Sequence, residues 1–156
     1  MKGLFLGLLT LCIGLVAGEV EQAFSAAFRR GDYQSAAQYG KISCENGHAS
    51  SCGLLGTLYK DGLGVKKDYV EAFSYFSRAC RGGSTFSCAD LGDIHRLGLV
   101  ATKDYELAYI NYKKSCDDSV AAGCTGLGHL YFDGQGVKKI ILKRLLTLSK
   151  VAMAAT

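Results

Sequence analysis

The chain has 156 residues, 49% of them hydrophobic, with seven cysteines and neither proline nor tryptophan. Its formal net charge of +4 does not come from the central region. Every acidic residue lies within residues 19–139, and the basic excess comes from Lys2, Lys143, Arg144 and Lys150. A central region of balanced charge gives no electrostatic basis for binding nucleic acid or an anionic membrane, so we expect neither as a partner.

The first 18 residues are typical of a secretory signal peptide. A lysine precedes an apolar run at residues 4–16, and small residues follow it. The run is shorter than the roughly 20 apolar residues that cross a bilayer, so we expect no transmembrane span but cleavage after Gly18, with cleavage after Ala17 as the alternative. The mature protein is then secreted or periplasmic and has lost Cys12.

From the first retained cysteine onward, the sequence repeats with a period of 36 residues. The cysteines fall in register as two sets, Cys44, Cys80 and Cys116, and Cys52, Cys88 and Cys124. Other residues recur at the same offset: Leu55-Gly56 and Leu91-Gly92, Gly62 and Gly98, and Asp68-Tyr69 and Asp104-Tyr105. A fixed period of this length is typical of a solenoid, in which each unit buries its apolar face against its neighbours.

Each unit is predicted to be a hairpin of two helices. In residues 51–60 the apolar side chains have helical spacing: Leu54, Leu55, Leu58 and Tyr59. Gly62 ends this helix, because glycine accepts the positive φ of a C-terminal cap, and Asp68 caps the next helix. The apolar stripe of the second helix is predicted at Val70, Ala72, Phe73 and Phe76. Residues 19–41 are predicted to form a first hairpin that matches the repeat pattern less closely than the later ones.

The spacing Leu-Gly-x-x-Tyr, then Gly-x-Gly-Val, then Asp and Ala resembles the Sel1-like subclass of tetratricopeptide-type repeats. The matching residues of the first full unit are Leu55, Gly56, Tyr59, Gly62, Gly64, Val65, Asp68, Ala72 and Ala79. The second unit departs from the pattern at His95, Val100 and Ala101. With two cysteines eight residues apart in every unit and a signal peptide, residues 19–139 resemble the Helicobacter cysteine-rich protein (Hcp) family.

This resemblance implies an all-α fold, a right-handed α/α superhelical solenoid of Sel1-like helix hairpins stapled by disulfides. The units are expected at about residues 19–47, 48–83 and 84–119, with an incomplete unit at 120–139. The resemblance also implies a secreted β-lactam (penicillin)-binding protein with slow β-lactamase activity, and it supplies no catalytic residue. Repeat architecture alone favours the alternative, a non-catalytic extracellular module that binds a protein or peptide.

Six cysteines remain in the mature chain, an even number in a secreted context, which predicts a disulfide framework. Many connectivities are open by number alone, but the repeat favours three local pairs, because each pair flanks the turn between one hairpin and the next. The expected pairs are Cys44 with Cys52, Cys80 with Cys88, and Cys116 with Cys124. Zinc is the competing interpretation, and it is disfavoured because zinc sites use cysteines about two to four residues apart.

The residues supply no recognisable active site. A serine β-lactamase needs Ser-x-x-Lys together with Ser-Asp-Asn and Lys-Thr-Gly elements, and none is present; the nearest sequence is Thr57 followed by Lys60. The histidines His48, His95 and His129 are isolated from one another, so we expect no metal and no cofactor. His95 replaces the tyrosine of the repeat and is expected to pack in its hairpin, whereas His129 is a candidate for the groove.

Two further groups of side chains recur near the first helix of the units. Helix capping or solvation is the expected role of the carboxylates Asp61, Asp90, Asp93 and Asp133. The helical spacing places four tyrosines on apolar faces, namely Tyr59, Tyr75, Tyr112 and Tyr131. We expect a monomer whose concave groove takes a β-lactam or peptidoglycan-like small molecule, or a protein or peptide.

Residues 140–156 break the repeat, and we interpret them as a frameshifted tail. Ile140 stands where an aspartate is due and Ala152 where a cysteine is due. Codons read one base earlier can give a tyrosine at position 141 and a cysteine at position 152, which would restore the unit. The last helix then loses its proper partner, which leaves Leu127, Leu130 and Tyr131 poorly covered unless the tail substitutes. A third functional hypothesis follows: a damaged copy with little function.

Overall fold

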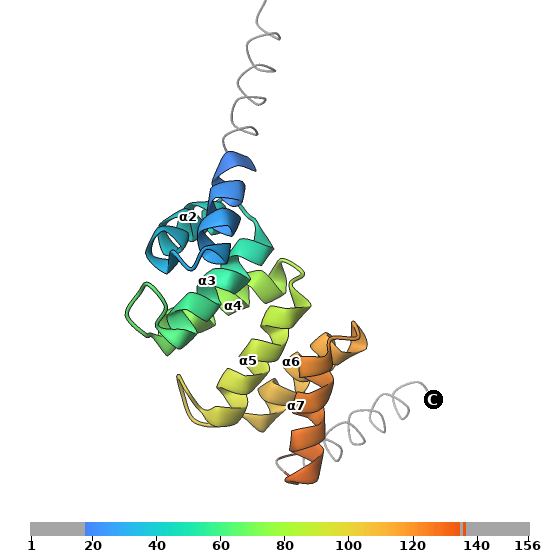
Figure 1. Ribbon diagram of the computed structural model, residues 1–156. Helices are drawn as coiled ribbons and strands as arrows, with labels where there is room; N and C mark the ends of the chain where they lie inside the picture. The colour runs from blue at the N-terminus through green and yellow to red at the C-terminus, as the bar shows by residue number, and fades with distance from the viewer. Residues whose placement is uncertain (1–17, 135, 137–156) are drawn as a thin grey trace, which may run out of the picture. The chain divides into compact units, whose positions relative to one another are not determined.

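In the computed structural model, residues 18–134 and 136 are described, and every regular element among them is a helix (Figure 1). After a first helix at residues 18–29 follow α2 (Tyr33–Glu45), α3 (Ala49–Asp61), α4 (Tyr69–Arg81), α5 (Thr85–Leu97), α6 (Tyr105–Asp117) and α7 (Ala121–Phe132). The predicted all-α class is confirmed. The predicted signal peptide, apart from Gly18, and the predicted frameshifted tail at 140–156 lie outside the described residues.

The chain forms two compact units, Met1–Ser87 and Cys88–Thr156. From here on, the first and second unit are these two compact parts of the chain and not the 36-residue repeats. Helices α2, α3 and α4 pack together within the first unit, and α6 packs on α7 within the second. In the described part of either unit, no helix is long and apolar enough to cross a membrane.

Aspartates spaced 36 residues apart start three of these helices. The carboxylates of Asp32, Asp68 and Asp104 each accept a hydrogen bond from a backbone N–H of the first turn of α2, α4 and α6. Gly62 ends α3 with φ 75°, the left-handed conformation that glycine adopts at little cost. The predicted capping by Asp68 and termination at Gly62 are therefore confirmed.

The first unit encloses a core of side chains from its helices. Its fully buried members are Phe24, Ala27, Ala36, Ala37, Leu55 and Leu58. The ring of Phe76 is also buried and lies so close to Gly56 that a Cβ there would be 2.8 Å from it, which explains the glycine of the Leu-Gly pair. The predicted apolar stripe of α4 is wrong at Val70, which is 62% exposed.

The core of the second unit is built around Tyr112 of α6. Its ring is buried and lies between Gly92 of α5 and Gly126 of α7, where added Cβ atoms would approach it to 2.5 and 2.3 Å. Leu130 is buried against it. The predicted poor cover of this helix depended on the tail at 140–156, which lies outside the described residues. Tyr131, by contrast, is half-exposed, and Phe132 is 92% exposed.

Disulfides lie at the connections between successive hairpins. Cys44 is bonded to Cys52 with an S–S distance of 2.04 Å, and Cys116 to Cys124 at 2.01 Å. Cys80 and Cys88 are disulfide-bonded as well. The predicted disulfide-stapled hairpin architecture is thus confirmed.

Candidate functional site

Three helices of the first unit each place one side chain in a cluster at the surface. The rings of Tyr59 from α3 and Tyr75 from α4 are stacked, with centroids 5.5 Å apart and planes 19° from parallel. The Lys41 Nζ from α2 lies 5.8 Å from the Tyr59 centroid. Both tyrosines are half-buried and Lys41 is exposed, so the Lys41–Tyr59–Tyr75 cluster offers aromatic edges and an ammonium group to solvent.

The cluster is electrostatically coupled. A hydrogen bond to the Tyr59 hydroxyl raises the pKa of Lys41. Burial raises the pKa of Tyr75, and the neighbouring Tyr59 and the carboxylate of Glu71 add to that shift. Lys41 is therefore cationic and Tyr75 neutral at physiological pH. The arrangement can hold an anion at Lys41 and an apolar or planar group against the rings.

The second unit does not repeat this cluster. One period on, His95 stands in place of Tyr59 and Asn111 in place of Tyr75. Burial lowers the pKa of His95, partly offset by the carboxylate of Asp104, so the imidazole is neutral at pH 7. His95 is half-buried, and its packing role in the hairpin stays a prediction. Because α5 and α6 form without the tyrosine pair, the stack is a property of the first unit and not a requirement of the hairpin.

The polar contacts of the second unit centre on Tyr112. Its hydroxyl donates a hydrogen bond of 2.6 Å to Asp93 Oδ1 and accepts one of 3.0 Å from Arg96 Nε. Arg96 Nη2 also lies 3.3 Å from Asp93 Oδ1. Asp93 is therefore neither a helix cap nor merely solvated, as the sequence led us to expect. The network pairs the charges of Asp93 and Arg96 and links α5 to α6 through hydrogen bonds. No local sequence pattern predicts it.

The other carboxylates and Tyr131 have plainer surroundings. Asp61 ends α3 and Asp133 follows α7, so neither caps a helix N-terminus, and both are exposed. Asp90 lies within α5. The ring of Tyr131 contacts that of Tyr109 edge to face, with centroids 6.4 Å apart.

The nearest approach to a β-lactamase sequence has no catalytic geometry. The Thr57 hydroxyl donates to the Gly53 carbonyl of its own helix at 3.3 Å, so its proton is engaged by the backbone. Lys60 Nζ lies 5.6 Å from the centroid of the Phe76 ring. A lysine base would instead have to reach the threonine hydroxyl to activate it.

The histidines occupy three different settings. His48 precedes α3, and its Nδ1 lies 3.2 Å from Glu21 Oε2 on the first helix. His129 is exposed near the end of α7. Within residues 18–134 and 136, no group of three or more His, Cys, Asp or Glu side chains could hold a metal ion.

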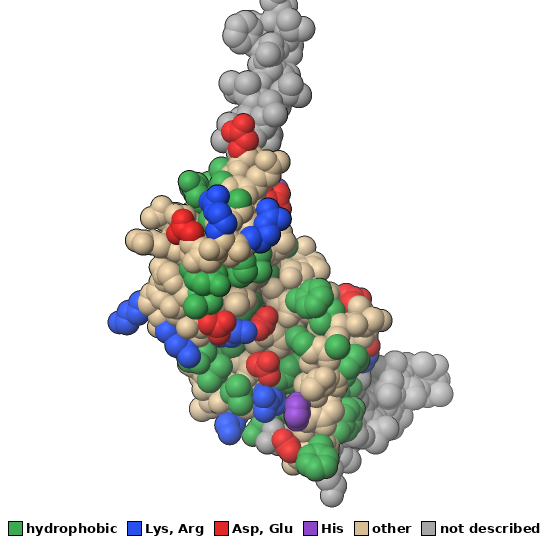
Figure 2. All heavy atoms as spheres, in the orientation of Figure 1, with side chains coloured by type: hydrophobic (Ala, Val, Ile, Leu, Met, Phe, Trp, Pro, Cys, Tyr) green, Lys and Arg blue, Asp and Glu red, His purple; other side chains and the backbone are tan. Residues whose placement is uncertain are grey.

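Charge is evenly mixed on the face shown in Figure 2. Acidic and basic side chains are interspersed with hydrophobic ones, and neither sign of charge gathers into a broad patch there. This agrees with the balanced charge of the sequence. We therefore expect a ligand to be selected by local clusters of side chains and not by the overall electrostatic field of the surface.

Comparison with known proteins identifies the repeat. The Sel1 repeat model matches at residues 18–48, 49–84, 85–119 and 121–139. The chain belongs to the Sel1 repeat family. This is consistent with hairpins whose second helices start at capping aspartates one period apart. No curated protein sequence matches the chain.

Several solved structures share the Sel1 repeat fold. The c5321 protective antigen of uropathogenic Escherichia coli strains, which displays an SLR fold, has a TM-score of 0.62 at 30% identity over 63% of this chain and 21% of its own. A Sel1 repeat protein from Oxalobacter formigenes has a TM-score of 0.61 at 25% identity, covering 65% of this chain and 40% of its own. This Sel1 repeat chain thus spans less than half the length of either protein.

Helicobacter pylori cysteine rich protein B has a TM-score of 0.57 at 24% identity, over 70% of this chain and 92% of its own. The predicted Sel1-like repeats are confirmed, and so is the solenoid class of the fold. The likeness to cysteine rich protein B is one of fold.

Proposed function

We propose that this cysteine-rich Sel1 repeat protein is a binding module that acts outside the cytoplasm and recognises a peptide or peptidoglycan-like fragment with a free carboxylate. The observation that carries the proposal is the Lys41–Tyr59–Tyr75 cluster, to which three helices each contribute one side chain. Sel1 repeats are in general protein-interaction modules, and a surface formed by several helices is the usual place for their ligands.

The chemistry of the cluster defines the ligand class. A carboxylate can pair with Lys41, while a peptide plane, an aliphatic side chain or a sugar face packs against the edges of the tyrosine stack. Arg78 is a further cation near Tyr75, although its Nη2 is bound to the Cys44 carbonyl at 3.1 Å. Glu71 disfavours a ligand with two adjacent anionic groups.

An extracellular or periplasmic location follows from the disulfides, which persist in oxidising compartments and are rare in the cytosol. The Cα–Cα distances of the Cys44–Cys52 and Cys116–Cys124 bonds, 4.7 and 4.6 Å, lie within the usual range for protein disulfides. Cleavage of residues 1–18 as a signal peptide is our proposal for the route.

β-Lactam binding with slow hydrolysis is the second candidate, and it is supported by the resemblance to Helicobacter cysteine-rich proteins. A penicillin carries a carboxylate beside an amide and so belongs to the ligand class of the cluster. Thr57 and Lys60 give no support to a serine-type hydrolase, because the threonine proton is turned to Gly53. Binding without turnover is therefore the form of this candidate that the described residues favour.

Calorimetric titration of the oxidised mature protein with muramyl dipeptide, and separately with benzylpenicillin, tests both candidates. We expect saturable binding of muramyl dipeptide that Lys41→Ala weakens about tenfold or more, because a charge-assisted hydrogen bond contributes roughly 1.5–3 kcal/mol. The matched control is Lys66→Ala, an exposed lysine of the α3–α4 connection, which should leave binding unchanged.

The outcomes separate the alternatives. Binding of benzylpenicillin with β-lactam ring opening above the buffer rate would favour the enzymatic candidate. Saturable binding that Lys41→Ala does not weaken would show that the ligand binds outside the Lys41–Tyr59–Tyr75 cluster. If neither probe binds, the proposed ligand class is wrong.

A further inference from the structure

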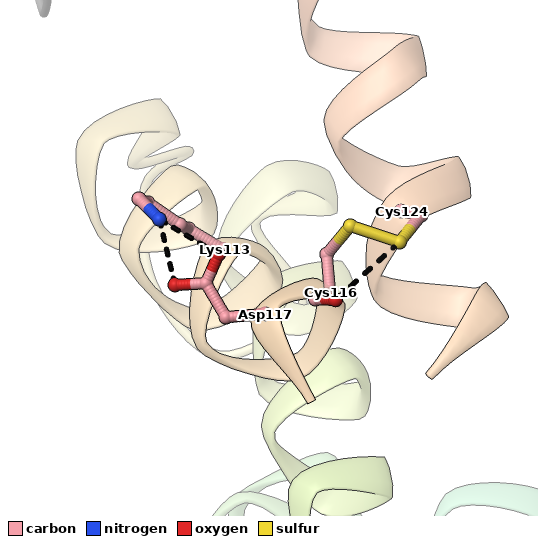
Figure 3. A network of polar contacts seen from close by, with 4 residues as sticks. All are labelled: Lys113, Cys116, Asp117 and Cys124. Atoms are coloured by element: carbon pink, nitrogen blue, oxygen red, sulfur yellow. Dashed lines mark hydrogen bonds and ion pairs between the residues drawn. A yellow bond between two sulfur atoms is a disulfide. The ribbon is translucent and has the colours of Figure 1, made fainter. Parts of the chain in front are cut away.

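The six disulfide-bonded cysteines differ in how much of them solvent can reach. Cys44 and Cys52 are 0% and 3% exposed, and Cys80 and Cys88 are 6% and 0% exposed. Cys124 is exposed on α7 and Cys116 is half-buried at the end of α6. Figure 3 shows this last bridge beside the exposed Lys113–Asp117 ion pair, with the Cys124 Sγ in contact with the Cys116 carbonyl oxygen at 3.7 Å. An external nucleophile therefore has its best access at Cys124.

The packing beside this bridge also lacks a hydrogen bond that the first bridge has. Next to Cys44–Cys52, the buried hydroxyls of Ser43 and Ser51 are joined at 2.7 Å. Two periods on, the corresponding residues are Ser115 and Gly123. The buried Ser115 Oγ has no hydrogen-bond partner among the described residues. The α6–α7 junction thus lacks a buried hydrogen bond that the α2–α3 junction has.

The loop closed by the Cys116–Cys124 bridge also contains backbone strain that its counterparts avoid. The left-handed position is a glycine in the two preceding loops, Gly47 with φ 95° and Gly83 with φ 96°. In the last loop it is Ser119 with φ 63°, a conformation that disfavours residues with a Cβ. Opening the bridge lets this residue leave the left-handed region.

From exposure, the missing hydrogen bond and the strained loop, we propose that Cys116–Cys124 is a thiol-exchange site that small-molecule thiols modify while the other two bridges stay closed. The thiolate RS⁻ attacks the exposed Cys124 Sγ. An RS–Sγ bond to Cys124 forms as the bond to Cys116 Sγ breaks, and the Cys116 sulfur leaves as a thiolate that takes a proton from water. One disulfide replaces another, so the step requires no further oxidant or reductant.

The test is timed exposure of the oxidised, secreted protein to reduced glutathione at pH 8. Samples are quenched with acid, the free thiols are alkylated, and modified cysteines are located by peptide mass spectrometry while circular dichroism follows the helices. We expect glutathione on Cys124 and an alkylated Cys116 at least tenfold sooner than modification of any other cysteine, in molecules whose helical signal is retained. The initial rate should rise with pH as the thiolate fraction of glutathione increases.

Two results with the parent protein would overturn the proposal. The first is opening of Cys44–Cys52 or Cys80–Cys88 as early as Cys116–Cys124. The second is a first modified species without helical signal, which would mean that exchange follows global unfolding. The control is the double variant Cys116→Ser, Cys124→Ser, which should take up no glutathione during the interval that modifies the parent. Uptake by the variant at the parent's rate would likewise place the reactive bridge elsewhere.

Discussion

At the scale of single residues, the Tyr112 hydroxyl shows how a repeat position acquires a specific role. The same position is Phe76 one period earlier, so the backbone accepts either ring. In the second unit the hydroxyl links Asp93 and Arg96, and burial raises the Tyr112 pKa, with the hydrogen bond to Asp93 adding to the shift. The proton thus stays on the tyrosine, where it serves as a donor.

Tyr112→Phe should lower the free energy of unfolding by about 1 kcal/mol, because it removes two hydrogen bonds and leaves the ring in place. Urea denaturation monitored by circular dichroism measures the change. Tyr39→Phe is the control, since Tyr39 is 40% exposed and its substitution should have no effect. Equal effects of the two substitutions would show that the Asp93–Tyr112–Arg96 network contributes nothing to stability.

His95 gives the protein a pH dependence with a defined sign. Burial lowers its folded-state pKa below the ordinary value of about 6.5, so the unfolded chain binds more protons between the two values. The contribution of this residue to stability is therefore complete above pH 6.5 and decreases as the pH falls through 6.5 towards the folded pKa. We expect His95→Tyr, which restores the residue found at Tyr59 and Tyr131, to lose less stability between pH 7 and pH 5 than the parent. Identical losses would contradict a half-buried imidazole that stays neutral.

Capping residues could be predicted because their effect is local, whereas the Tyr112 network could not. Asp68 and Gly62 act on backbone groups within a few positions, so sequence alone identifies them. Asp93 and Tyr112 are 19 residues apart and meet only when α5 packs on α6. The stacked Tyr59 and Tyr75 were placed correctly on apolar faces, but their pairing with Lys41 depends on the approach of α2.

At the scale of elements, replacing a glycine of α7 by alanine should have opposite effects on stability at two positions, Gly126 and Gly128. An alanine Cβ at Gly126 would lie 2.3 Å from the Tyr112 ring, whereas at Gly128 it would meet nothing within 4 Å. Gly126→Ala should therefore destabilise the second unit by roughly 1–3 kcal/mol through overpacking. Gly128→Ala should stabilise it by up to about 1 kcal/mol through helix propensity.

Thermal denaturation of the two variants measures both effects on one helix. The expected result is a lower melting temperature for Gly126→Ala and an equal or higher one for Gly128→Ala. Changes of the same sign would contradict the close packing of Tyr112 between α5 and α7.

Helices were easier to predict than the faces they bury. Val70 was assigned to the apolar stripe of α4, yet it lies two residues before Ala72 and hence about 200° around the helix axis. Ala72, Phe76 and Ala79 have the true spacing of the buried face. On α7 the difficulty is a different one. Nearly all of its residues are apolar, so composition does not distinguish the buried Leu130 from the exposed Phe132.

At the scale of the whole molecule, the period of 36 residues predicted the hairpins, their connections and the family, because every unit repeats the same local signals. The ligand could not be predicted in this way, since the Lys41–Tyr59–Tyr75 cluster arises from departures between units and not from the repeat itself. The frameshift proposed for residues 140–156 also rests on the sequence, because that tail lies outside the described residues.

Reduction of all disulfides should lower stability by several kcal/mol, because each closed loop contributes about 2–3 kcal/mol in the chain-entropy model, and the three contributions need not add fully. Urea titration of the oxidised and reduced protein, with a reductant present only in the second series, measures the difference. A shift of less than about 1 kcal/mol would mean that packing alone holds the hairpins.

Disulfide mapping of the oxidised protein tests the central claim most directly, namely that consecutive hairpins are joined by three local bridges. Proteolysis without reduction, followed by mass spectrometry, should recover linked peptides for Cys44–Cys52, Cys80–Cys88 and Cys116–Cys124, and thiol titration of the unfolded, unreduced protein should find no free thiol. Six free thiols, or a bridge that joins cysteines of different pairs, would contradict the claim.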